Sequence, residues 1–315
     1  MKKLVSIGEA LIDFIPIGNG RIQDIEAFEP HIGGAPSNVC GAYAKLGGQA
    51  SIITQLGEDS FGDKINEELK QEGVDTSYIV RTDKANTSLA FVALSTDGNR
   101  QFSFYRNPGA DMLLEADQIK EEWFKDAYAL HFCSVDLGDF PMKKAHARAI
   151  AYAKKNQALI SFDPNVRLSL WKKEEDCRKA ILEFLPEADI LKISDEELEF
   201  ITGKTKIEEA EDILFQGNVK AVVYTAGSHG ASLITKKMHV YEPSLKVKAV
   251  DTTGAGDGFI GSFLYQLSQD EVNDLTQVAE DRWSLYLRNS ASFCAESIQH
   301  KGAISSYPTS LKYKE

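Results

Sequence analysis

A short glycine-rich segment in the C-terminal half carries the residues best suited to chemistry. In DTTGAGDGF (251–259), the small residues Gly254, Ala255 and Gly256 leave backbone N–H groups uncovered just before an apolar helical pattern. Amides at a helix start bind anions through hydrogen bonds and the helix dipole. A carboxylate such as Asp257 is unfavourable there unless it accepts a proton. If the anion is a phosphoryl group in transfer, Asp257 can take the proton of the attacking hydroxyl while the amides stabilise the developing charge.

Two other interpretations of this segment stay open from the residues alone. Asp257 is also a residue type that caps ordinary helices. The stretch GDGFIG (256–261) matches the G-x-G-x-x-G pattern of dinucleotide-binding folds. That match is weak, because Asp257 would face a pyrophosphate and the following acidic residues, Glu280 and Asp281, lie in a helical pattern. A dinucleotide-dependent oxidoreductase is therefore kept as an alternative.

The elements that must position this segment alternate between strands and helices. Short apolar runs predict strands at 129–134, 158–163, 188–194 and 220–227, and amphipathic patterns predict helices at 141–156, 174–185 and 195–215. Such alternation predicts an α/β fold with a mostly parallel sheet and helices on both faces. Ligands of these sheets bind at the carboxyl ends of the strands.

Two extended segments interrupt the alternation, at about 12–32 and 87–106. The second has period-two patterning around the turn signal TDGN (96–99), which predicts a hairpin. Together they predict a small β layer that acts as a lid on the α/β body. We find no repeat or linker composition, so residues 1–315 are predicted to form one domain. The first eighteen residues are predicted to form a first strand, since Glu9 and Asp13 break the apolar run that a signal peptide needs.

Composition excludes several classes of protein. The 315 residues are 43% hydrophobic and 26% charged, which is typical of a globular chain with a large core. The formal charge of −12 and the scattered Lys and Arg argue against nucleic-acid binding, and no apolar run is long enough to span a membrane. The cysteines are too widely spaced for a disulfide framework or a zinc site. We expect a cytoplasmic protein.

Longer motifs resemble a known family. GGAPSNVCGAYAKLGGQASIITQLGEDSFGDKI (33–65) and DTTGAGDGF resemble the two signature segments of the ribokinase-like (PfkB) carbohydrate kinases. GEALIDFIP, FYRNPGADMLL, SFDPNVRLSLW and ILKISDEELEF are similar to the fructokinase branch, and the resemblance continues to residue 309. It implies an ATP-dependent sugar kinase, folded as a ribokinase-like three-layer sandwich with a mostly parallel central sheet and a small β-strand lid.

The resemblance also implies roles for individual residues. Sugar contacts fall on Asp13, Gly33, Gly34 and Asn38, with Arg106 and Arg167 reaching the sugar or the phosphates. Nucleotide contacts fall on Asn165, Lys192, Thr225, Gly227 and Gly230, with Asn289 near the adenine. Taken singly, these residues are equally typical of turns, helix caps and surface ion pairs.

The metal-binding pattern departs from that of the family. Where the ribokinase-like pattern has Asn-x-x-Glu for magnesium and phosphate, this chain has Ser194 and Glu197. The resemblance implies that Glu197 holds Mg²⁺ through water, with Ser194 a weaker substitute for the amide. It also implies a K⁺ site at Asp251 and Thr253.

The expected activity is transfer of the ATP γ-phosphate to the 6-hydroxyl of D-fructose, with Asp257 as general base. A 2-keto-3-deoxygluconate kinase stays open, because Arg106 or Arg167 would suit the carboxylate of that substrate. So does a non-catalytic sugar-sensing protein on the same scaffold, although an intact GAGD argues against it. Exposed strand edges in the lid predict a homodimer formed through the lid.

Overall fold

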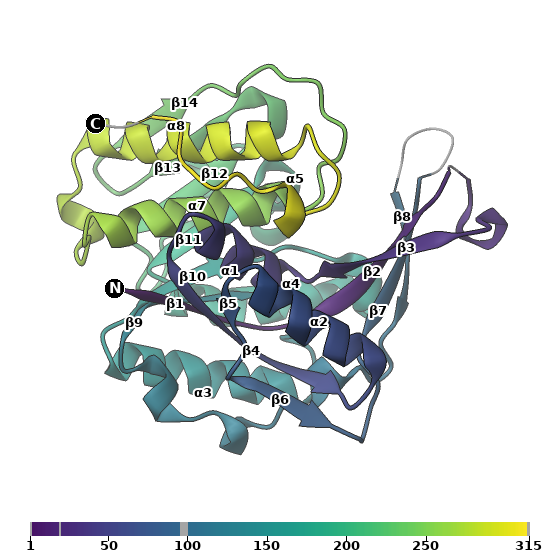
Figure 1. Ribbon diagram of the computed structural model, residues 1–315. Helices are drawn as coiled ribbons and strands as arrows, with labels where there is room; N and C mark the ends of the chain where they lie inside the picture. The colour runs from purple at the N-terminus through teal and green to yellow at the C-terminus, as the bar shows by residue number, and fades with distance from the viewer. Residues whose placement is uncertain (1, 19, 95–99, 314–315) are drawn as a thin grey trace.

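The chain folds as two β-sheets of unequal size with helices packed on the larger one (Figure 1). The computed structural model describes residues 2–18, 20–94 and 100–313. The strands are β1 (Lys3–Ile7), β2 (Leu11–Pro16), β3 (Phe28–Gly33), β4 (Gln49–Gly57), β5 (Val74–Asp75), β6 (Ile79–Thr82), β7 (Leu89–Leu94), β8 (Arg100–Tyr105), β9 (Ala127–Cys133), β10 (Leu159–Asp163), β11 (Ile190–Ser194), β12 (Ala221–Thr225), β13 (Ala231–Ile234) and β14 (His239–Glu242). The α-helices are α1 (Ala35–Lys45), α2 (Ser60–Gln71), α3 (Pro141–Lys155), α4 (Glu174–Phe184), α5 (Asp195–Thr202), α6 (Glu211–Leu214), α7 (Ala255–Gln269) and α8 (Glu280–Ser297).

The larger sheet has the order β14-β13-β12-β11-β10-β9-β1-β4-β5, with β6 also paired to β4. Its central pairs are parallel, and only the β12–β13 and β13–β14 pairs are antiparallel among those described. The predicted α/β fold with a mostly parallel sheet is confirmed.

Successive residues of a strand point to opposite faces of the sheet. Both faces of this sheet carry apolar side chains, and helices cover both. Leu4 of β1 belongs to the core under α1, α7 and α8, whereas its neighbour Val5 belongs to the core under α3, α4 and α5. Aromatic side chains fill each core: Phe263 stacks on Trp283 on one side, and Phe132 stacks on Phe162 on the other. The result is a three-layer sandwich.

The smaller sheet has the order β3-β2-β7-β8 and projects from one side of the body (Figure 1). Its strands come from the two segments predicted to be extended. The TDGN turn lies outside the described residues. One face of this sheet carries stacked rings, with Phe14 and Phe91 4.5 Å apart between centroids. The other face turns Ile15, Val92 and Phe104 toward the body, as period-two alternation requires.

Two predicted elements are wrong in extent. The N-terminal run forms two strands in different sheets, because the chain turns at Gly8, where φ is +147° and a Cβ would lie 2.6 Å from Cγ of Pro36. The helix predicted at 195–215 ends at Thr202, because Gly203 takes a left-handed C-cap conformation (φ 72°). A 3₁₀ turn and the short α6 follow.

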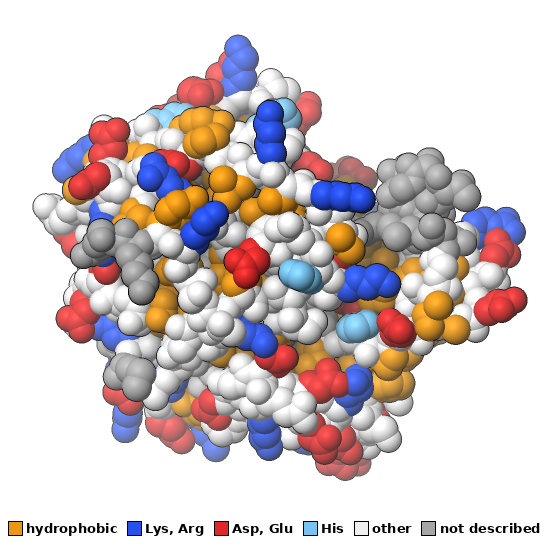
Figure 2. Space-filling view, turned by 45° about the horizontal axis from the view of Figure 1, so that its top comes forward, with side chains coloured by type: hydrophobic (Ala, Val, Ile, Leu, Met, Phe, Trp, Pro, Cys, Tyr) orange, Lys and Arg blue, Asp and Glu red, His pale blue; other side chains and the backbone are white. Residues whose placement is uncertain are grey.

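The surface drawn in Figure 2 shows Lys and Arg side chains interspersed with Asp and Glu, without a continuous area of one sign. No helix within the described ranges is long and apolar enough to cross a bilayer. Cys40, Cys133 and Cys177 are buried free thiols, and Cys294 is a partly buried one.

Candidate active site

A cavity of about 450 Å³ lies between the start of α7, the carboxyl ends of β10 and β11, and the inward face of the smaller sheet. Twelve predicted site residues line it: Asp13, Gly34, Asn38, Asn165, Arg167, Lys192, Glu197, Thr253, Gly254, Ala255, Gly256 and Asp257. This position is the one expected for ligands of a parallel sheet. The fold therefore brings these residues from five separate stretches of the chain to one place.

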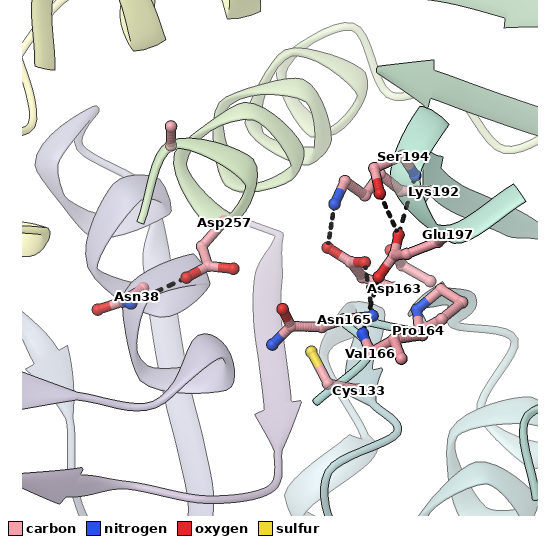
Figure 3. Close-up of polar contacts among 12 residues, drawn as sticks. Asn38, Cys133, Asp163, Pro164, Asn165, Val166, Lys192, Ser194, Glu197 and Asp257 are labelled. Carbon is pink, nitrogen blue, oxygen red and sulfur yellow. Dashed lines mark hydrogen bonds and ion pairs between the residues drawn. The ribbon is translucent and has the colours of Figure 1, made fainter. Parts of the chain in front are cut away.

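Asp257 is held at the first turn of α7 by a side chain from α1. Gly254, not Asp257, occupies the N-cap position (φ 72°), so the alternative that Asp257 merely caps the helix is wrong. Nδ2 of Asn38 donates a hydrogen bond of 2.8 Å to Oδ2 of Asp257 (Figure 3). Burial raises the pKa of Asp257, and the Asn38 bond and the charges of Lys192 and Arg167 offset part of that rise.

Close packing requires glycine at Gly254, and Gly256 lies beside a buried cation. A Cβ at Gly254 would lie 2.6 Å from Oη of Tyr307 and 2.7 Å from Cβ of Ala303. A Cβ at Gly256 would lie 3.2 Å from Nζ of Lys192, so the ammonium sits directly beside this backbone. The first amides of a helix have no acceptor within the helix. The N–H of Ala255 donates to the backbone oxygen of Thr252 (3.3 Å), so the turn offers the N–H groups of Gly256 and Asp257, with the Lys192 cation, to a bound anion.

Lys192 is anchored by a buried ion pair at the end of β11. Its Nζ lies 2.9 Å from Oδ2 of Asp163 in β10, and the two side chains are 8% and 1% exposed. Burial alone would lower the pKa of Lys192, but the carboxylates of Asp163 and Glu197 outweigh it and raise that pKa above its ordinary value. Burial raises the pKa of Asp163 to about 6 despite the attraction of Lys192. The ammonium thus stays charged and fixed in place.

Ser194 and Glu197 form a capping box at the start of α5 (Figure 3). Oε2 of Glu197 accepts hydrogen bonds from the backbone N–H and hydroxyl of Ser194 (2.9 and 2.8 Å), and Oε1 accepts one from the N–H of Val166 (2.7 Å). Burial acts to raise the pKa of Glu197, but Lys192 and these donors lower it. Since both oxygens are engaged, the carboxylate suits a metal held through water rather than directly. Among the described side chains, no three His, Cys, Asp or Glu gather at metal-ligand spacing.

Asp13 lies on the cavity side of β2, against Gly33, and Gly34 packs on the backbone before β2. A Cβ at Gly33 would lie 2.1 Å from Oδ2 of Asp13, and one at Gly34 would lie 2.4 Å from the backbone oxygen of Glu9. Any side chain at either position would displace the carboxylate or the strand. Glu9 also lines the cavity and was not predicted, because a single acid in an apolar run carries no signal of its own.

Seven predicted residues lie outside the cavity lining. Gly33 lies against Asp13, which does line the cavity. Arg106 is buried in ion pairs with Asp111 and Asp136. Thr225, Gly227 and Gly230 lie at and after the end of β12. Asp251 accepts hydrogen bonds from Thr253 and Gly302. The Asn289 side chain is bonded to Gln266 and to the backbone of Tyr313 near the C-terminus. Their roles stay predictions.

The family model for pfkB family carbohydrate kinases matches residues 1–310. The chain belongs to the PfkB family. Fructokinase-1 of Zea mays is 41% identical over 311 residues, which cover 97% of this chain and 94% of that protein. This PfkB chain therefore matches a relative over nearly the whole length of both, and the predicted family and carbohydrate kinase class are confirmed.

Two solved PfkB-type structures resemble this one over almost their whole length. Fructokinase from Xylella fastidiosa with bound ATP has a TM-score of 0.89 at 32% identity, with 97% of this chain and 95% of that chain covered. Fructokinase from Vibrio cholerae O395 in its fructose, ADP and calcium ion bound form has a TM-score of 0.86 at 30% identity, with 98% and 96% covered. The ribokinase-like fold is thereby confirmed.

Proposed function

We propose that this kinase transfers the γ-phosphate of ATP to the 6-hydroxyl of D-fructose. The observation that carries the proposal is the Asp257 carboxylate, held by Asn38 beside uncovered helix amides and facing the same cavity as Lys192. The likeness to fructokinases, one with bound ATP and one with fructose and ADP, supports both substrates.

In the proposed reaction, Asp257 accepts the proton of the sugar hydroxyl as that oxygen bonds to phosphorus and the bond from phosphorus to the ADP oxygen breaks. The amides of the α7 turn and the ammonium of Lys192 stabilise the charge on the transferring group. The raised pKa of Asp257 favours proton acceptance. Mg²⁺, when bound, would neutralise phosphate charge, with Glu197 holding it through water.

Asp13 and Asn38 are proposed to bind sugar hydroxyls, since a buried hydroxyl without a partner is costly. Gly33 and Gly34 give the sugar and the Asp13 carboxylate room. Nucleotide contacts are proposed for Asn165, Thr225, Gly227, Gly230 and Asn289, and a K⁺ site is proposed at Asp251 and Thr253. A cytoplasmic location fits this activity.

A second candidate, 2-keto-3-deoxygluconate as substrate, is favoured by Arg167 alone, which lines the cavity and donates a hydrogen bond to the backbone of Val166. A coupled ADP-release assay over fructose, ribose, 2-keto-3-deoxygluconate and aminoimidazole riboside tests the choice. We expect the highest kcat/KM with fructose. A higher value with the sugar acid would overturn the substrate assignment, and nicotinamide turnover without ADP release would overturn the kinase.

We further propose that the smaller sheet is a lid that closes over the sugar. It carries Asp13, and its Ile15, Val92 and Phe104 form an apolar wall that would exclude water from the phosphoryl group. Amide exchange in β2, β3, β7 and β8 is expected to slow when fructose is added. Unchanged exchange at saturating fructose would contradict the lid.

The lid is also the proposed dimer contact. β3 and β8 are its edge strands, and Phe102 and Tyr105 of β8 are 41% and 65% exposed. Exposed edges and large apolar side chains favour association with a second copy. Sedimentation is expected to give a dimer that dissociates when Tyr105 is replaced by Lys; a wild-type monomer would contradict this.

A further inference from the structure

The smaller sheet is connected to the body at four crossings of the chain. The chain enters the sheet before β2 and before β7, and it leaves after β3 and after β8. The residues at these crossings are Glu9, Ala35, Ser88 and Arg106. All four belong to one buried polar cluster, which also includes Asp111 and Asp136 of the body.

Arg106 is the centre of this cluster. Its Nε donates to Oδ2 of Asp111 at 2.7 Å, and its Nη2 is paired with Oδ1 of Asp136. The Arg106 side chain is 4% exposed and each aspartate is 1% exposed. The guanidinium carbon also lies 5.6 Å from the centroid of the Phe140 ring, which is within the range of a cation–π contact.

The other crossings join this cluster in two different ways. The Ser88 hydroxyl donates to Oδ1 of Asp111, which ties the entry to β7 to the exit from β8. The backbone N–H of Ala35 donates to Oε1 of Glu9 at 3.1 Å, which ties the exit from β3 to the entry to β2. Glu9 is 4% exposed and interacts electrostatically with Arg106 and Asp111. Hydrogen bonds through Asp111 therefore join the crossings at Ser88 and Arg106, and the charge of Glu9 links the other two crossings to the Arg106 guanidinium.

Packing leaves little freedom in this arrangement. A Cβ at Gly109 would lie 1.9 Å from Oγ of Ser88 and 2.7 Å from Oδ1 of Asp111, so only glycine lets the loop after β8 close on the cluster. Oε2 of Glu9 and Oδ2 of Asp136 accept no hydrogen bond from the described residues. An excess of buried carboxyl groups makes the single cation indispensable, because removing one partner of a buried pair leaves an uncompensated charge.

We propose that Arg106 is a positioning residue that clamps the four crossings of the smaller sheet and so holds Asp13 and Gly33 at the cavity. It acts through Asp111 and Asp136 and does not touch the sugar. This inference rests on the proposed function only in assigning Asp13 to the sugar; the clamp itself is a property of the protein without substrate.

The test is hydrogen exchange of Arg106→Lys without sugar, followed by kinetics with fructose. Lysine keeps the charge but cannot bridge two carboxylates with a planar fork. We expect amides of β2, β3, β7 and β8 to exchange about tenfold faster or more, while β9 and β10 are unchanged. KM for fructose should rise by a larger factor than kcat falls. Asp136→Asn should give the same pattern more weakly.

Arg282→Lys is the control, because Arg282 also pairs through Nε and Nη2 with an aspartate, Asp270, but at the far end of α7, where the two side chains are 28% and 26% exposed. It should leave lid exchange and KM unchanged. Unaltered lid exchange in Arg106→Lys together with a raised KM would overturn the clamp and make Arg106 a direct sugar ligand. Amide exchange that is accelerated equally in β9 and β10 would also overturn the clamp, since Arg106 would then stabilise the whole fold rather than the smaller sheet. If the wild type fails to phosphorylate fructose, the exchange measurement still decides the clamp.

Discussion

Asp257→Asn is expected to lower kcat by about two to four orders of magnitude, the usual range for loss of a general base. The asparagine Oδ1 can still accept the hydrogen bond that Asn38 donates, so the shape of the site is kept. Stability should not fall, because burial already disfavours the charged carboxylate and the amide removes that cost. KM values for fructose and ATP should change far less than kcat, as a stopped assay over both substrates would measure.

Asp274→Asn is a suitable control for this substitution. Asp274 caps a short 3₁₀ helix by accepting a hydrogen bond of 2.9 Å from the N–H of Thr276, and it lies outside the cavity lining. Asn caps a helix as well as Asp does, so the turnover of Asp274→Asn should equal that of the wild type. If Asp257→Asn also kept near-normal kcat, Asp257 would not be the base.

Lys192→Met is expected to have the second largest effect, on both turnover and stability. Loss of the ammonium beside Gly256 should lower kcat by about two to three orders of magnitude, as for removal of one group that stabilises the transition state. It also leaves Asp163 buried without its cation, which typically costs about 3–5 kcal/mol. Denaturant unfolding and steady-state kinetics measure the two effects.

The stability loss in Lys192→Met should depend on pH. The folded-state pKa of Asp163, about 6, is already above its ordinary value of 3.8, and loss of Lys192 should raise it further. A carboxyl with a raised folded pKa binds its proton more tightly in the folded state, so stability falls as pH rises above the ordinary value. The variant should therefore be destabilised more at pH 8 than at pH 5.

The double variant Asp163→Asn, Lys192→Met separates the two effects. It removes the unpaired charge, so part of the stability should return while kcat stays low. Recovery of kcat along with stability would show that Lys192 is needed only to neutralise Asp163.

Sequence patterns predicted the parts of this structure that depend on local periodicity. The strands β9 to β12 and the helices α3 and α4 lie within a few residues of their predicted bounds, because burial on both faces and an amphipathic stripe both mark the sequence directly. The position of Asp257 at a helix start followed from three small residues in a row.

Features that depend on tertiary contacts could not be predicted in this way. The apolar run around Gly8 gives no sign of a turn. Glycine is needed there because Pro36, which is distant in the sequence, packs against it. Arg106 has partners 5 and 30 residues away, and nothing in their spacing links them. Asn289 is bonded to Tyr313, 24 residues later, so its environment depends on how the C-terminal segment returns to α8.

The most direct test of the account is ³¹P and ¹³C NMR of the product formed from ATP and D-fructose by the wild-type protein, with Asp257→Asn in parallel. We predict that each ADP released is matched by one fructose 6-phosphate, and that the variant forms the same product far more slowly. ADP release without a sugar phosphate, phosphate on a different hydroxyl, or equal rates in the two proteins would contradict the proposed reaction.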